Sequence, residues 1–357
     1  MEPFIPALLD PSLVRPATWQ SSPRREGLIW LDKNENLDPE LLAANARHLR
    51  ATADLALATY PEAAALYHKL AAWCGVPVDG LMLTPGSDGA IRLIFQACLA
   101  PGETVLHTQP TFAMYPVYGK MFGATAATLT YRRGPNGPEL TVEEVIEALR
   151  AHQPKLFCLP NPDSPTGTVF NPEGMRALLD ECARLGTVFL VDEAYHPFHR
   201  ETMVPLTRTH RNLFVARTFS KAWGCAGLRV GYLVGHPEMM PFLHKLRPMY
   251  EVGTFSVAVM ERIIDHPGAM EASVARLEKG RAALLETVHG LGYTSFPTVG
   301  NFQHVCFGEA ASRIHPALSG VALYRPDFQE ECLRGASRFS LTTAEGFAPV
   351  LEALRKA

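Results

Sequence analysis

The sequence predicts an α/β protein in which a mainly parallel sheet lies between two layers of helices. From about residue 40 to residue 255, short apolar segments that end in turn residues alternate with longer helical patterns. This alternation is typical of a parallel sheet covered on both faces, whose strands read as continuous apolar runs. The strands are expected at 104–108, 155–160, 187–192, 212–218 and 229–234.

Length and composition favour one large α/β domain followed by a smaller domain in the same chain. The chain has 357 residues, of which 47% are hydrophobic and 19% are charged. After a break at Pro267-Gly268, a second helix and then strands near 292–295, 302–307 and 338–341 indicate a small α+β domain. We expect three parts, namely an N-terminal arm at 1–40 that packs with the small domain, a large domain at 41–255 and the small domain at 256–357.

Several classes of function are excluded by composition. A net charge of -3 argues against a nucleic-acid partner, and the lack of an 18-residue apolar run argues against a membrane span. Seven scattered cysteines indicate reduced core residues, hence the cytoplasm. His196 and His199 have no third ligand nearby, so no metal site is expected.

The stretch from Thr218 to Tyr232 carries the strongest chemical signal. Lys221 follows the hydroxyls of Thr218 and Ser220, and Arg229 lies eight residues further on in a Gly-rich turn. A partly desolvated lysine amine has a lowered pKa and can act as a nucleophile and a base. The hydroxyls and the guanidinium could hold a phosphate nearby. The alternative is a strand–turn–helix with an ordinary surface lysine.

Two further segments place polar groups at strand ends. The apolar run 187–192 ends in Asp192, where ligands of open α/β sheets bind, although Asp192 alone could be a helix or turn cap. Another apolar strand runs into Gly86 and then a helix. Free N–H groups and the helix dipole make such a start an anion site, so Ser87 and Asp88 are candidates for binding a phosphate.

Together these segments resemble the fold-type I pyridoxal-phosphate (PLP) enzymes. Their lysine motif reads S-K-x-x-x-x-A/G-G-x-R-x-G, as does the stretch from Ser220 to Gly231, and an Asp-x-x-Tyr motif precedes it by the family's distance. The resemblance implies a seven-stranded, mainly parallel sheet and a cofactor held by Lys221 as an internal aldimine. It also implies that Asp192 faces the pyridine nitrogen and that Tyr195 reaches the phenolate oxygen.

Two more cofactor contacts follow from this resemblance. The turn from Asn161 to Gly167 is similar to the family's N-P-x-x-P-T-G turn, but Ser164 stands where many relatives carry an asparagine whose amide donates to the phenolate oxygen. Either Asn161 or Ser164 could make that contact. Phe112 lies in a segment similar to the family's P-T-Y and is implied to stack on the cofactor ring, the alternative being a core phenylalanine.

The whole chain resembles the histidinol-phosphate aminotransferase-like branch of the class I/II aminotransferases. Asn36 closes a segment similar to the branch's L-x-x-N-E-N-P and is implied to bind substrate. Tyr60 lies in a segment similar to R-Y-P-E, whose tyrosine crosses to the partner subunit's cofactor phosphate, so the resemblance implies a homodimer with Tyr60 acting in trans. Arg338 matches the arginine that grips the substrate's α-carboxylate.

The predicted function is a PLP-dependent aminotransferase. It would move an amino group between an amino acid, or an amino-alcohol phosphate, and a 2-keto acid, with the freed Lys221 carrying the proton. A threonine-phosphate decarboxylase-like enzyme or an amino-acid oxidase could use the same residues. A non-catalytic regulator built on this fold would need a DNA-binding segment, for which we expect no room.

The amino donor and acceptor stay open, but one substitution bears on them. In the branch, the segment after Gly320 supplies an arginine for the substrate phosphate, whereas this chain has Tyr324 in that place and Arg325 one position later. We therefore expect a carboxylate-bearing amino acid to be preferred over histidinol phosphate, unless the side chain of Arg325 reaches the substrate phosphate.

Overall fold

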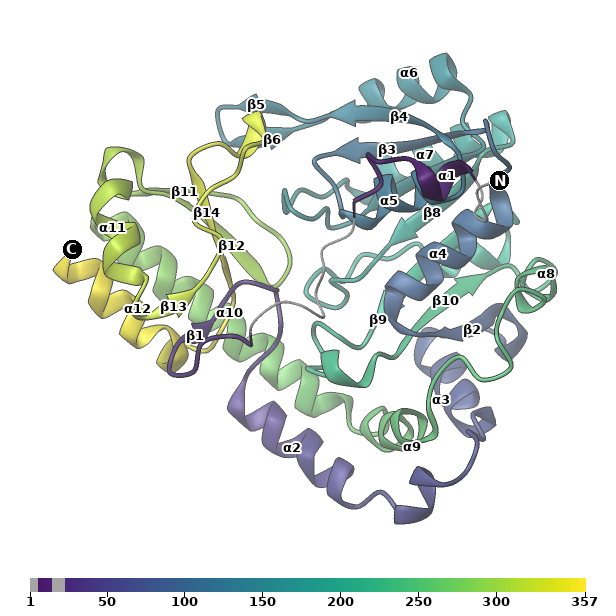
Figure 1. Ribbon diagram of the computed structural model, residues 1–357, viewed down its shortest axis with the longest axis horizontal. Coiled ribbons are helices and arrows are strands. Elements are labelled where there is room, and N and C mark those ends of the chain that lie inside the picture. Colours follow the sequence, from purple (N-terminus) through teal and green to yellow (C-terminus); the bar gives the residue numbers. More distant parts are fainter. Residues whose placement is uncertain (1–5, 15–22) are drawn as a thin grey trace.

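The computed structural model describes residues 6–14 and 23–357, and a twisted sheet flanked by helices forms its larger part (Figure 1). Within the described residues this sheet has seven strands, in the order β2 (Leu81–Thr84), β10 (Gly231–Gly235), β9 (Leu213–Thr218), β8 (Val188–Asp192), β7 (Leu156–Pro160), β3 (Thr104–Gln109) and β4 (Thr125–Thr130). Strand β10 runs antiparallel to both neighbours, and the other pairs are parallel. The predicted fold class and the five predicted strands are confirmed, with ends shifted by one or two residues.

Strand β8 shows why these segments form the centre of the sheet. Its sequence, VFLVD, is apolar and partly β-branched up to the final acid, and Phe189 to Asp192 are buried. Apolar side chains alternate between the two faces of the sheet. Phe189 therefore belongs to one core and Leu190 to the other, and helices must cover both faces.

Each face of the sheet has its own set of helices. One core contains apolar side chains from α3 (Ala64–Cys74), α6 (Val142–His152), α7 (Pro172–Leu185) and α9 (Thr254–Ile263). The opposite core contains side chains from α4 (Gly86–Cys98), α5 (Met114–Met121) and α8 (Met240–His244). A hairpin of β5 (Arg132–Gly134) and β6 (Gly137–Glu139) follows β4.

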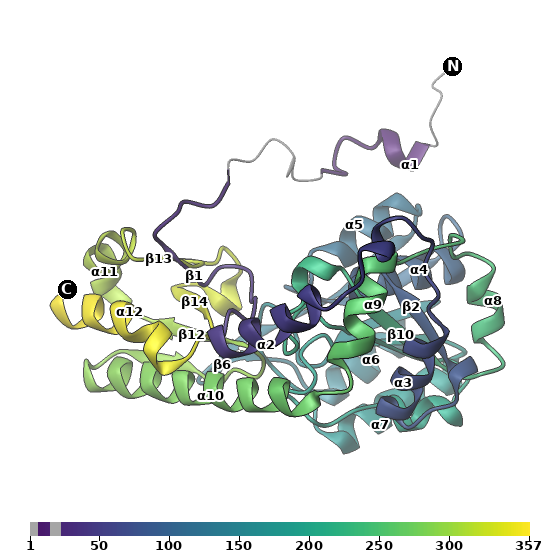
Figure 2. The same cartoon turned by 90° about the horizontal axis from the view of Figure 1, so that it is seen from below.

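The carboxyl-terminal part forms a second, smaller layer beside the large sheet (Figures 1 and 2). An antiparallel sheet of β11 (Thr294–Phe296), β12 (Phe302–Cys306) and β14 (Ala336–Ser340) packs with α10 (Pro267–Gly290), α11 (Ala311–Leu318) and α12 (Ala344–Lys356). Pro267 is the first residue of α10, a position where its missing N–H costs nothing.

The N-terminal segment contacts both layers. Strand β1 (Ile29–Trp30) pairs in parallel with β13 (Ala322–Leu323), and the short helix α1 (Pro6–Leu9) lies near α5. Helix α2 (Pro39–Arg50) begins at the capping residue Asp38, which also accepts a hydrogen bond from Arg276 of α10 (Nε–Oδ2 3.0 Å). Residues 1–5 and 15–22 of the predicted arm lie outside the described residues, and the three domain boundaries stay predictions.

Helix α10 packs closely on the turn that precedes α12, and this contact gives a test of the fold. A Cβ at Gly280 would collide with the backbone carbonyl of Thr342, whereas a Cβ at Gly268 in the same helix would meet nothing. Gly280→Ala should lower the free energy of unfolding by about 1 to 3 kcal/mol, because the backbone cannot move aside cheaply. Urea unfolding followed by circular dichroism would measure this change.

Gly268→Ala is the matched control for this substitution. It removes a helical glycine without a clash, so it should leave stability unchanged or raise it by up to about 1 kcal/mol. Equal unfolding midpoints for the two variants would contradict the packing described for α10.

Candidate active site

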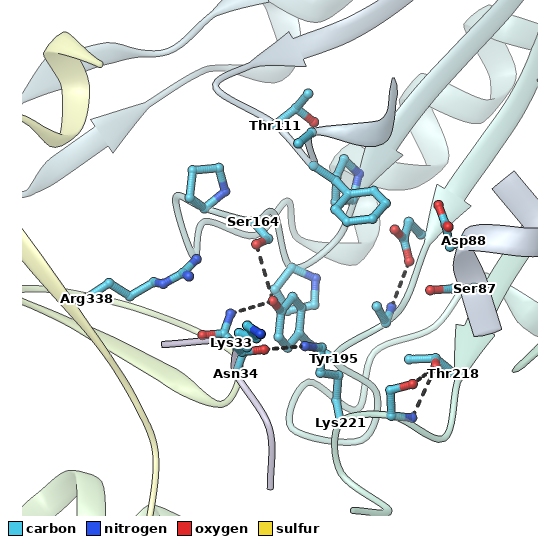
Figure 3. A pocket seen from close by; sticks show the side chains of 18 of the residues that line it. Lys33, Asn34, Ser87, Asp88, Thr111, Ser164, Tyr195, Thr218, Lys221 and Arg338 are labelled. Carbon is cyan, nitrogen blue, oxygen red and sulfur yellow. Dashed lines mark hydrogen bonds between the residues drawn. The ribbon is translucent and has the colours of Figure 1, made fainter. Parts of the chain in front are cut away.

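A cavity of about 450 Å³ lies at the carboxyl ends of β8 and β9, where the two layers meet (Figure 3). Arg338 reaches it from the small sheet, while Ser87 and Asp88 face it from the start of α4 on the other side. The structure brings eleven of the sequence-predicted site residues to its wall: Ser87, Asp88, Phe112, Ser164, Asp192, Tyr195, Thr218, Ser220, Lys221, Arg229 and Arg338.

Lys221 sits in the loop that follows β9. Its Nζ donates a hydrogen bond to the carbonyl oxygen of Lys33 at 2.9 Å. Burial of the ammonium, with the positive charges of Arg338 and Arg229 nearby, lowers the pKa of Lys221 to about 8. A substantial fraction of the amine is therefore neutral near pH 8, which is the form that can attack an aldehyde.

Asp192 is the last residue of β8 and points into the cavity. Its neighbour Glu193 instead forms a buried ion pair with Arg217 (Oε2–Nη2 2.9 Å). Asp192 accepts hydrogen bonds from the amide of Ala194 (3.0 Å) and the hydroxyl of Tyr115 (3.3 Å). Burial raises the pKa of Asp192 to about 7, and a cationic ring N–H beside it would favour the ionised carboxylate.

The start of α4 and the loop after β9 together present the donors of a candidate anion site. Gly86 has φ +74°, and a Cβ there would lie 2.5 Å from Nη2 of Arg229. The guanidinium of Arg229 donates to Ser220 Oγ (3.1 Å), to which Thr218 Oγ1 also donates (2.9 Å). A helix N-terminus, two hydroxyls and a guanidinium are the donors that a phosphate monoester needs, so these residues fit the PLP phosphate.

Tyr195 is held in the cavity by two side chains. Its hydroxyl accepts a hydrogen bond from Asn34 Nδ2 (2.9 Å) and donates one to Ser164 Oγ (3.3 Å). The sequence analysis missed Asn34, although it belongs to the same motif as Asn36. Only the backbone decides which asparagine faces the cavity, and Asn34 adopts φ 55° there.

Three residues of the predicted site do not line the cavity. Asn36 is buried and donates to the carbonyl of Ala222 (2.9 Å) and to Ser273 Oγ (3.0 Å). Both amide atoms of Asn161 bond to the backbone of Phe170. Tyr60 is 74% exposed on the outer surface. Their predicted roles in binding stay predictions.

Arg338 and its neighbour Arg325 supply two guanidinium groups to the cavity. Arg338 Nη2 donates to the carbonyl of Asp32 (3.1 Å), while its buried Nε donates to no residue in the described ranges. Burial and the charge of Arg325 lower the pKa of Arg338. The sequence analysis left Arg325 open and gave no role to Glu330, Thr111 or Lys33, which also line the wall. Thr111 is the threonine of the segment similar to P-T-Y and Lys33 lies in the segment that Asn36 closes, whereas no motif marks Glu330.

The described residues show neither a membrane-spanning helix nor a cluster of metal-binding side chains. No helix in that part of the chain is both long and apolar enough to cross a membrane. Likewise, residues 6–14 and 23–357 contain no group of three or more His, Cys, Asp or Glu side chains that could hold a metal ion.

Comparison with known proteins assigns the chain to a family. The model of the family "Aminotransferase class I and II" matches residues 26–354. The chain is 36% identical over 339 residues to histidinol-phosphate aminotransferase 2 of Bordetella parapertussis, covering 92% of this chain and 90% of that protein. It is 30% identical over 319 residues to the histidinol-phosphate aminotransferase of Thermoanaerobacter pseudethanolicus, covering 89% of each.

A solved structure agrees in fold. The histidinol-phosphate aminotransferase of Sinorhizobium meliloti, solved with pyridoxal 5'-phosphate, superimposes with a TM-score of 0.82 at 20% identity, covering 100% of this chain and 98% of that one. The family model and the identity to the Bordetella protein each span most of the chain. The chain therefore belongs to the class I and II aminotransferases, enzymes whose cofactor is pyridoxal 5'-phosphate.

Proposed function

We propose that this aminotransferase moves an amino group between an amino acid whose α-carboxylate binds Arg338 and an amine that carries a second anionic group beside Arg325. The observation that carries the proposal is the pair of guanidinium groups in one cavity with Lys221. Arg325 and Arg338 are partners in an isolated antiparallel bridge, with N–O distances of 3.1 and 2.8 Å. Side chains of such partners lie on the same face, so two anion-binding groups stand side by side.

Arg325 also changes the expectation drawn from Tyr324. The hydroxyl of Tyr324 hydrogen-bonds to His315 (2.8 Å) and its ring stacks on Phe339 (4.5 Å between centroids), within the core of the small layer. Arg325, one position later, lines the cavity. A second cation is therefore present despite Tyr324, which the sequence analysis allowed through Arg325, and we propose a phosphate-bearing substrate. The names of the relatives also support histidinol phosphate as the first compound to test.

Each residue around Lys221 would have its own role in catalysis. When bound, PLP supplies an aldehyde and an electron-withdrawing ring that stabilise negative charge on the substrate's α-carbon. Arg229, Ser220 and the N-terminus of α4 would hold its phosphate, and Asp192 would hold a proton on its ring nitrogen. The neutral Nζ of Lys221 would take a proton from the substrate's α-carbon and deliver it to the C4′ carbon of the cofactor.

Ser164 is the better candidate for the phenolate contact that the sequence left open. Ser164 lines the cavity and bonds to Tyr195, whereas the amide of Asn161 is used by the backbone of Phe170. Freeing Asn161 would leave buried backbone groups without partners. The hydroxyls of Ser164 and Tyr195 would then both donate hydrogen bonds to the phenolate oxygen of the cofactor.

The decarboxylase and oxidase alternatives are not favoured, because the family and the relatives are named as aminotransferases. We propose that the enzyme is a cytoplasmic homodimer. The cytoplasmic placement is supported by seven free cysteines, all within the described residues. The homodimer is supported by an exposed apolar surface made of Leu55, Leu57, Tyr60, Met249 and Tyr250.

The first functional prediction concerns attachment of the cofactor. Reduction of the PLP-loaded protein with borohydride should fix the cofactor's mass on the peptide that contains Lys221. Because the pKa of Lys221 lies at about 8, the rate of attachment to the apoprotein should rise with pH around that value, as the amine loses its proton. An ordinary lysine would titrate near 10. Absorbance after mixing measures the rate.

Lys33→Ala is the control for this experiment, since Lys33 also lines the cavity but bonds to Lys221 only through its backbone. Its labelling should resemble that of the unchanged protein, and Lys221→Ala should show none. Modification that maps to another lysine would exclude Lys221 as the attachment point.

A second prediction tests the dimer. Tyr60 is exposed and stacks on Tyr250 (4.5 Å between centroids), so we expect it to complete the site of a partner subunit. Tyr60→Ala and Lys221→Ala should each be severely impaired alone. After subunit exchange they should regain part of the activity, because one site of the mixed dimer has both residues. No recovery despite proven exchange, or a monomer by sedimentation, would count against a shared site.

The third prediction tests the second anion. Histidinol phosphate and histidinol differ only in the phosphate. The ratio of their kcat/KM values, measured with 2-oxoglutarate as amino acceptor, therefore reports the contribution of the phosphate alone. The ratio should exceed roughly tenfold, about 1.4 kcal/mol, and Arg325→Ala should remove most of it. The exposed Arg334, in the same loop, is the control: Arg334→Ala should keep the ratio. Equal efficiency for the two amines would contradict the proposed substrate class.

A further inference from the structure

One carboxylate on the substrate side of the cavity has no role in the steps above. Glu330 lines the wall, between Arg325 and the buried Cys332 in sequence. Its Oε2 is buried and accepts no hydrogen bond from any residue that the structure describes. The nearest cation, Nη2 of Arg325, lies 3.6 Å away, which is beyond hydrogen-bond range.

Arg325 does not depend on Glu330 for its position. Its guanidinium lies over the ring of the buried Phe328, 3.9 Å from the centroid, and its Nε donates to the carbonyl of Asp327 (3.3 Å). The backbone on both sides is fixed by the bridge to Arg338. The loose contact with Arg325 thus leaves the acceptor capacity of Oε2 unused, and a buried acceptor without a donor is costly.

We propose that Glu330 is a specificity-determining residue whose Oε2 accepts a hydrogen bond from a nitrogen in the substrate's side chain. The class of group it takes is a heterocyclic N–H or an ammonium, because a carboxylate attracts such donors and repels a further anion. The assignment deepens the proposed function and rests on it for the reaction. The assignment holds whether or not the substrate carries a phosphate. The N–H donor would meet Glu330, and the anionic group would meet Arg325.

This assignment explains why the wall carries both signs of charge. Two guanidinium groups alone would favour any dianionic acid. A carboxylate beside them penalises an acid whose side chain ends in an anion near Glu330 and favours a side chain that brings a donor. The cavity then selects amines with an N–H donor between their reacting carbon and any second anionic group.

The test uses histidine and phenylalanine, two amino acids without phosphate that share the α-carboxylate and differ in a ring N–H. Half-reactions with the PLP-loaded enzyme would be followed by absorbance. In Glu330→Met, which keeps the side chain's length but removes both acceptors, efficiency with histidine should fall by about ten- to a hundredfold. Efficiency with phenylalanine should stay within about twofold.

Glu331→Met is the matched control, because Glu331 is exposed, adjacent and loses the same charge without lining the cavity. It should leave both half-reactions unchanged. Equal loss for histidine and phenylalanine in Glu330→Met would overturn the proposal, since it would mean a purely structural role. An unchanged histidine reaction together with a gain for glutamate would also overturn it, because Glu330 would then be only a counter-ion for Arg325.

Failure of the proposed function can be told apart from failure of this inference. If histidinol phosphate and histidinol react equally well, the proposed binding of a second anionic group is wrong. The comparison of histidine with phenylalanine still reports on Glu330. If the unchanged enzyme discriminates histidine from phenylalanine and Glu330→Met does not, the inference stands without the phosphate.

Discussion

The active site depends on one close approach of backbone to backbone. Gly231 of β10 pairs with Thr84 of β2 and Thr218 of β9, and a Cβ on it would lie 2.6 Å from the amide nitrogen of Ser87. Only glycine lets the first turn of α4 rest against the sheet at this point. That contact brings the N-terminus of α4 to the loop of Lys221. Without it, the proposed phosphate donors and the amine of Lys221 would not share a cavity.

Burial then sets the charges of the two reactive groups. Desolvation disfavours charge on both, so the pKa of Lys221 falls to about 8 and that of Asp192 rises to about 7. A cofactor ring nitrogen beside Asp192 would restore its negative charge, because an opposite charge stabilises the ionised form. The positive charge of Arg338 lowers the pKa of Lys221 further, and so links the substrate subsite to the amine.

The small layer supplies the residues to which we assign the selectivity of the cavity. Arg338 lies on β14 and Arg325 on the segment bridged to it, so one small sheet orients both guanidinium groups. Glu330 follows in the next loop and adds a negative charge to the same wall. The large sheet therefore holds the residues proposed to bind the cofactor, while the small layer holds those proposed to select the substrate's side chain.

The sequence by itself determined the parallel core, because buried strands need continuous apolar runs and the chain has them at 155–160, 187–192 and 212–218. It also identified Lys221, Asp192 and Arg229, whose local spacing carries the chemistry. It named Asn36 and missed Asn34, it left Asn161 and Ser164 both open, and it left open whether Arg325 replaces the arginine for which Tyr324 is substituted. In each case the candidates lie within three positions of one another and all carry polar side chains. Only the tertiary structure decides which of them faces the cavity, because that depends on a backbone turn and on partners more than a hundred residues away, such as Tyr195 for Asn34.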